Sequence, residues 1–116
     1  MKLLLSLFLL CSSYLLAAQS KDEKAILQML ETQNQAWNRG DVSGFMKGYW
    51  ENDSLMFIGK SGVTYGYQNT LENYKKGYPD TAAMGKLTTK QIKMIRVSKE
   101  YYFIVGKWYL KRSIGD

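Results

Sequence analysis

The sequence contains no histidine, one proline and a single cysteine, Cys11, among its 116 residues. Without histidine the chain supplies neither a Ser-His-Asp or Cys-His nucleophile system nor a histidine metal ligand. It also has no glycine-rich phosphate loop, paired-cysteine motif or metal-ligand cluster, so we expect no metal and no cofactor. The length corresponds to one domain or part of one, and the apolar fraction of 46% excludes a disordered chain.

Residues 1–20 have the layout of a secretory signal peptide. Lys2 precedes an apolar run over 3–10, and small residues follow at 17, 18 and 20. A membrane anchor is the alternative, because residues 14–16 prolong the run, although a span needs roughly 20 residues. Bulky Leu10 disfavours lipidation at Cys11. We expect cleavage, export to the periplasm or the medium, no stable membrane anchor afterwards, and a mature domain over 21–116.

Three helices are predicted from the spacing of apolar residues. The first has its repeated positions at Ile26, Met29, Leu30, Gln33 and Trp37, of which Gln33 alone is polar. Asp41 can cap a shorter second helix with apolar positions at Val42, Phe45, Met46 and Tyr49. The third has an almost wholly aromatic face and ends at Gly77 and Pro79; its apolar positions are Tyr67, Leu71, Tyr74 and Tyr78.

Strands are predicted in the second half of the chain. A short hairpin is expected over 54–58 and 63–65, and two long strands over 87–97 and 101–111. In the first long strand the apolar residues change faces between Met94 and Ile95, which predicts a β-bulge or a sheet that is apolar on both sides. Helices followed by antiparallel strands indicate an α+β fold, with the helices packed on one face of a curved sheet.

Several segments carry a family resemblance: AWNRGD at 36–41, GYW at 48–50, LMFIG at 55–59, TYGYQNTLENYKKGYPD at 64–80, MGKLT at 84–88 and GKWYLKR at 106–112. They resemble small exported bacterial members of the nuclear-transport-factor-2-like superfamily, with the SnoaL-like or ketosteroid-isomerase-like cone fold. The resemblance implies three N-terminal helices on the concave face of a cone-shaped antiparallel sheet. It implies no single activity, because this superfamily includes isomerases, dehydratases, epoxide hydrolases, binding proteins and an oligomerising kinase domain.

The chain departs from this family at its C-terminus. Similar relatives continue past the Gly115–Asp116 turn with about two more strands, so we expect the domain over 21–116 to be incomplete there. The missing strands would leave an unpaired edge along 101–111. If the sheet is complete, the expected oligomer is a homodimer formed through the sheet face.

An aromatic set is the main candidate for a ligand pocket. Such residues can line a cavity between helices and sheet in a cone fold, and an apolar pocket with a few polar groups is the usual small-molecule site. The alternative is that the rings only fill the core. The candidate pocket residues are Trp37, Phe45, Tyr49, Trp50, Phe57, Tyr65, Tyr74 and Trp108, with Tyr67 and Tyr78 as further members of the set.

An acid–base site would need a carboxylate held in an apolar wall beside a tyrosine donor. The candidate carboxylates are Asp53, Glu51 and Glu72, and the candidate donors are Tyr49, Tyr65 and Tyr74. Asp53 lies in an expected turn, which favours a capping role, and Glu72 is expected to face solvent. The resemblance assigns no catalytic residue.

The C-terminal part is basic, with ten basic and three acidic residues over 73–116. Such a surface could attract an anionic ligand, a membrane or nucleic acid. Export argues against nucleic acid, and lysines spread along strands favour solubility and edge protection. We expect binding of a small apolar or amphipathic molecule; an isomerase-, dehydratase- or hydrolase-type enzyme and an oligomerisation module are the alternatives.

Overall fold

The computed structural model describes residues 21–113. The predicted signal peptide and the expected continuation beyond Asp116 lie outside the described residues. The described elements are a helix over 21–38, α2 (Val42–Met46), β1 (Met56–Gly59), β2 (Gly62–Tyr65), α3 (Tyr67–Gly77), α4 (Thr81–Met84), β3 (Lys86–Arg96) and β4 (Tyr102–Lys111). None of the described helices combines the length and hydropathy that a membrane span requires.

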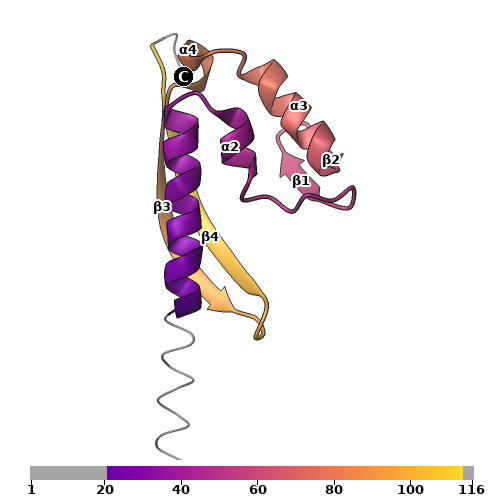
Figure 1. The fold of residues 1–116 in the computed structure, drawn as a ribbon, viewed down its shortest axis with the longest axis vertical. Coiled ribbons are helices and arrows are strands. Elements are labelled where there is room, and N and C mark those ends of the chain that lie inside the picture. The colour runs from indigo at the N-terminus through magenta and orange to yellow at the C-terminus, as the bar shows by residue number, and fades with distance from the viewer. Residues whose placement is uncertain (1–20, 114–116) are drawn as a thin grey trace, which may run out of the picture.

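The predicted α+β class is confirmed, with the helices first and the long antiparallel strands last (Figure 1). Within the described residues the strands form two separate two-stranded sheets, β1–β2 and β3–β4, where the sequence indicated one curved sheet. The N-terminal helix runs along the β3–β4 hairpin, while α2, α3 and the β1–β2 hairpin form a lobe at one side (Figure 1).

The N-terminal helix is held against β3 by side-chain amides. Asn38 is bonded twice to the backbone of Leu87: its Oδ1 accepts from the N–H, and its Nδ2 donates to the carbonyl oxygen at 3.1 Å. Four residues earlier, the Asn34 amide donates to the Thr89 hydroxyl at 2.6 Å. All the predicted positions of this helix are half-buried or buried, as are Asn34 and Ala36, so the periodicity identified most of the packed face.

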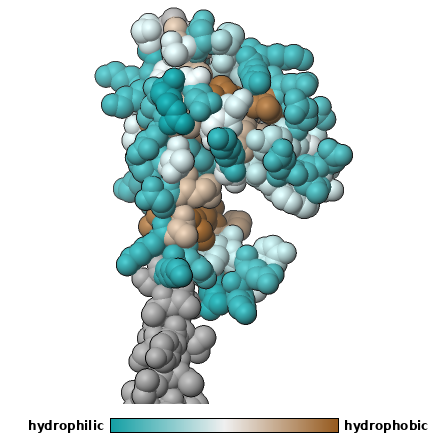
Figure 2. Space-filling model, viewed as in Figure 1, coloured by the Kyte–Doolittle hydropathy of each residue, from teal (hydrophilic) through white to brown (hydrophobic). Residues whose placement is uncertain are grey.

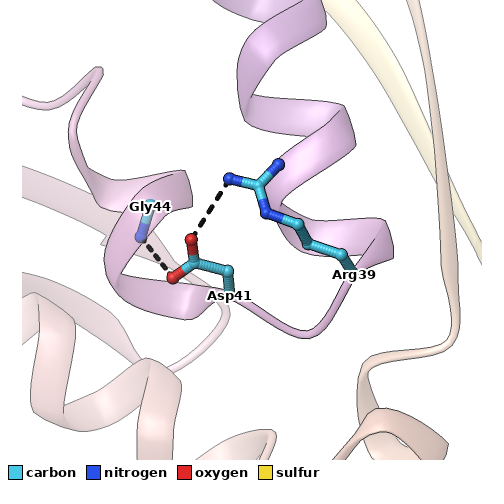
Figure 3. A network of polar contacts seen from close by, with 3 residues as sticks. All are labelled: Arg39, Asp41 and Gly44. Atoms are coloured by element: carbon cyan, nitrogen blue, oxygen red, sulfur yellow. Dashed lines mark hydrogen bonds and ion pairs between the residues drawn. The ribbon is translucent and has the colours of Figure 1, made fainter.

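Asp41 caps α2, as predicted. Its Oδ1 accepts from the Gly44 N–H at 2.8 Å, and its Oδ2 lies 3.2 Å from the Arg39 guanidinium (Figure 3). The hydrogen bond from Gly44 is the main cause that lowers the pKa of the Asp41 carboxyl. The helix ends at Met46, one turn before the predicted Tyr49, since Gly44 and Gly48 are poor helix formers.

The β3–β4 hairpin contains a bulge, as one of the two alternatives predicted, but it lies before Met94 and not between Met94 and Ile95. Gln91 pairs with Gly106 and Lys93 pairs with Val105, so Ile92 is the extra residue. On the inner face Leu87 pairs with Leu110, and beyond the bulge Met94 pairs with Ile104. The outer face therefore has lysines at one end and exposed apolar side chains at the other: Lys86, Lys90, Lys93, Lys107 and Lys111, then Ile95, Phe103 and Val105.

Trp37 lies at the centre of the core. Its side chain is 3% exposed and its indole N–H donates to the carbonyl oxygen of Met84 at 2.9 Å. Met84 ends the short helix α4, which periodicity did not predict; Asp80 caps it by accepting from the Ala83 N–H. The buried residues of this core are Trp37, Val42, Met46, Leu71, Met84 and Leu87.

Candidate functional site

A cavity of about 910 Å³ lies between the N-terminal helix, α2, α3 and the two hairpins. In the space-filling view a hollow separates the lobe from the lower end of the β3–β4 hairpin, and apolar side chains gather beside it (Figure 2). The volume is within the range of small-molecule pockets, about 300–1,000 Å³. Its aromatic lining residues are Trp37, Phe45, Tyr49, Phe57, Tyr74, Tyr78 and Trp108.

The aromatic wall is built from rings in edge-to-face contact around Trp37. The Trp37 ring centroid lies 5.0 Å from that of Phe45 and 4.9 Å from that of Tyr78, with steep interplanar angles. Tyr74 joins this cluster to β1, because its ring centroid is 5.6 Å from that of Phe57. Aromatic pairs in this geometry each contribute roughly 0.5–1.5 kcal/mol beyond their buried area. The wall is therefore an apolar surface built from four elements: the N-terminal helix, α2, α3 and β1.

Two phenols form the polar centre of this wall. The hydroxyl oxygens of Tyr49 and Tyr74 lie 3.1 Å apart, and both side chains are half-buried. Burial raises the pKa of Tyr74 well above its ordinary value of 10.0, and burial also raises that of Tyr49. Both phenols are thus neutral at physiological pH. One hydroxyl donates to the other, which leaves the second hydrogen free to bond an oxygen of a bound molecule.

Alkaline pH is expected to destabilise the fold through these phenols. The unfolded chain loses their protons near pH 10, whereas the raised pKa values keep them on the folded protein. Stability is therefore complete below about pH 10 and falls as the pH rises further, because the folded state then binds more protons. Urea unfolding at about pH 9 and about pH 11 measures this loss. A Tyr49→Phe/Tyr74→Phe double variant with the same loss would contradict the assignment.

The structure places six of the eight predicted pocket residues in the lining: Trp37, Phe45, Tyr49, Phe57, Tyr74 and Trp108. Trp50 and Tyr65 are outside it, with 60% and 61% of their surface exposed. Tyr65 points away because side chains alternate along β2 and its neighbour Thr64 faces the cavity. Trp50 follows the turn after α2 and lies on the surface. Of the two further aromatic candidates, Tyr78 lines the cavity and Tyr67 packs on the core.

The candidate carboxylates are not brought to the cavity. Glu51, Asp53 and Glu72 are exposed and absent from its lining. The turn at Asp53 is present, but its side-chain cap is the neighbouring Asn52, whose Oδ1 accepts from the Ser54 N–H at 2.8 Å. Glu72 faces solvent as predicted and accepts from the Gln68 amide at 3.3 Å. The carboxylate–tyrosine arrangement of the enzyme hypothesis is therefore not assembled among residues 21–113.

Sequence reasoning missed the polar side of the cavity. Asn73 and Lys76 from α3, and Lys60 from the turn between β1 and β2, contribute to the lining. The spacing of Asn73 and Lys76, one helical turn apart, was a usable signal, because residues at i and i+3 share a helix face. The aromatic periodicity of α3 drew attention to Tyr74 and not to these polar neighbours. No group of three or more potential metal ligands occurs in the described part of the chain.

These features define an α+β protein with an aromatic-lined cavity between its helices and its sheets. No protein-family model and no curated protein matches the chain. Among solved structures it is similar to an NTF-2-like protein of unknown function from Shewanella oneidensis MR-1, with 40% sequence identity and a TM-score of 0.74. The match covers 78% of this chain and 75% of that protein. The chain belongs to the NTF-2-like family, and the predicted family is confirmed.

Proposed function

We propose that this chain is an exported binding protein that holds a small apolar or amphipathic molecule in its aromatic cavity. The observation that supports it is the cavity itself, which has seven aromatic side chains and no carboxylate in its lining. A pocket with an apolar wall and a few polar groups is suited to binding. No aspartate or glutamate lines the cavity, so the lining contains no carboxylate that could act as a general acid or base. The signal-peptide pattern of residues 1–20 supports export.

A homodimer is part of this proposal. Three apolar side chains on the outer face of β3–β4 are 39–57% exposed: Ile95, Phe103 and Val105. Pairing two copies about this apolar end would bury it in both and keep the lysine rows at opposite outer ends, where they repel least.

Native mass spectrometry of the protein recovered from the exported fraction of its host tests ligand and dimer together. We expect a dimer of the cleaved chain that retains a small molecule. Phe57→Asp places a charge in the cavity wall and should release the molecule without dissociating the dimer. Phe103→Asp changes the outer face in the same chemical way and should give a monomer that keeps the molecule. A ligand-free wild-type protein, or a Phe57→Asp variant that retains the molecule, would contradict binding in the cavity.

A further inference from the structure

The charged groups that line the cavity are all of one sign. Lys60 and Lys76 contribute to the lining, and no aspartate or glutamate does. The remaining polar lining residues are amides, hydroxyls and phenols, which carry no charge at physiological pH. A cavity with an apolar wall and only cationic charge selects against cations and favours anions.

The two lysines come from neighbouring elements at the same side of the cavity. The Asn73 amide lies 3.4 Å from the Thr64 hydroxyl, which places this face of α3 beside β2. Lys76 follows Asn73 by one turn on that face. Lys60 stands in the two-residue turn that joins β1 to β2, where Gly59 pairs with Gly62. The lysines therefore border the part of the cavity between α3 and the β1–β2 hairpin.

Neither lysine forms an ion pair within the described chain, where the ion pair found joins Arg39 to Asp41. Both Lys60 and Lys76 are exposed, so their flexible stems can bring an ammonium group to the cavity mouth. The Trp37, Phe45 and Tyr74 rings lie deeper, at the core. The cavity thus has an apolar interior and a cationic border.

We propose that the molecule bound in this cavity is an amphipathic anion, with its apolar body against the aromatic wall and its anionic headgroup between Lys60 and Lys76. This inference rests on the proposed binding function and names the ligand class of that same site. The spare phenol hydrogen of the Tyr49–Tyr74 pair can bond an additional oxygen on the body of the molecule. A lysine ammonium group acts as a point charge, so the site should select the headgroup by its negative charge more than by its shape.

Three probes with one hydrocarbon chain and different headgroups test the inference: decanoate, decanol and decylamine. Calorimetric titration of the mature protein at low ionic strength should show that decanoate binds about tenfold more tightly than decanol. Decylamine should bind more weakly than decanol. The preference for decanoate should shrink as salt is added, because the headgroup is near solvent.

Paired lysine variants locate the effect. Lys60→Gln/Lys76→Gln should remove the preference for decanoate and leave decanol affinity unchanged. Lys47→Gln/Lys75→Gln is the matched control, since it removes the same charge from exposed lysines outside the cavity lining. Equal binding of decanoate and decanol by the wild-type protein would overturn the inference and leave the binding function standing. Binding of none of the three probes would overturn both.

Discussion

Replacing Trp37 with alanine is expected to lower the free energy of unfolding by about 3–5 kcal/mol. The side chain is 3% exposed and contacts the rings of Phe45, Tyr74 and Tyr78. Its removal leaves a void between three helices and deprives the Met84 carbonyl of its indole donor. Urea unfolding followed by far-UV circular dichroism measures the change, and a loss below about 1 kcal/mol would contradict the central position of Trp37 in the core.

Two further variants identify the origin of that loss. Trp50→Ala removes the same side chain from a site that is 60% exposed, so stability should change by no more than about 0.5 kcal/mol. Trp37→Phe keeps an aromatic ring but removes the indole donor to Met84 and part of the side-chain volume. Its loss of stability measures these two contributions without the loss of the whole ring. A Trp50→Ala variant as unstable as Trp37→Ala would show that the cost does not come from burial.

Replacing Gly85 with alanine is expected to destabilise the fold at the junction of α4 and β3. Gly85 has φ 61° and ψ −157°, a conformation that is almost restricted to glycine and costs other residues roughly 1–3 kcal/mol. A Cβ atom there would also lie 2.5 Å from the Lys111 carbonyl oxygen. That oxygen belongs to the backbone of β4, beside the first pair of the hairpin, Lys86 with Lys111, and cannot move without disturbing it. Thermal and urea unfolding should both record the loss.

Gly77→Ala is the matched control for this substitution. Gly77 is the last residue of α3, and a Cβ atom there would have no neighbour within 4 Å. Alanine is the better helix former, so stability should stay the same or rise by up to about 1 kcal/mol. If Gly85→Ala were as well tolerated as Gly77→Ala, neither the φ of Gly85 nor its contact with Lys111 would constrain the junction.

The elements that periodicity predicted are those whose buried face is long. The N-terminal helix and α3 each carry a repeated apolar spacing over three turns, and burial of that stripe determines the helix. The phase slip after Met94 predicted either a bulge or a sheet apolar on both sides, and both features occur: the bulge lies earlier, at Ile92, and Met94 and Ile95 alternate normally between the inner face and an apolar outer face. The capping role of Asp41 followed from its position before an apolar repeat.

Features that depend on tertiary contacts could not be predicted in this way. The helix α4 has a single turn, so its four residues contain no periodicity; its sequence signals were the cap Asp80 and the following Gly85. The position of Lys60 and Lys76 at the cavity border could not be predicted, because it depends on the packing of α3 beside β2. In the sequence alone, both residues have the pattern of ordinary solvent-facing lysines. The exposure of Trp50 and Tyr65 likewise depends on which side of the turn or strand faces the core.

The bulge at Ile92 determines where the β3–β4 hairpin can change its length. Before the bulge, odd-numbered residues of β3 face the N-terminal helix; after it, even-numbered residues do. Deletion of Ile92 would restore simple alternation and keep Met94 inward and Ile95 outward, if the turn to β4 held its register, because Ile92 has no partner in β4. A one-residue deletion elsewhere between Lys86 and Gln91 would instead turn the residues on one side of it to the opposite face. Homologous chains that lack Ile92 should therefore keep the apolar pattern of residues 94–97 on the same faces. The unpaired residue is thus a position where evolution can shorten this strand without turning its core side chains outward.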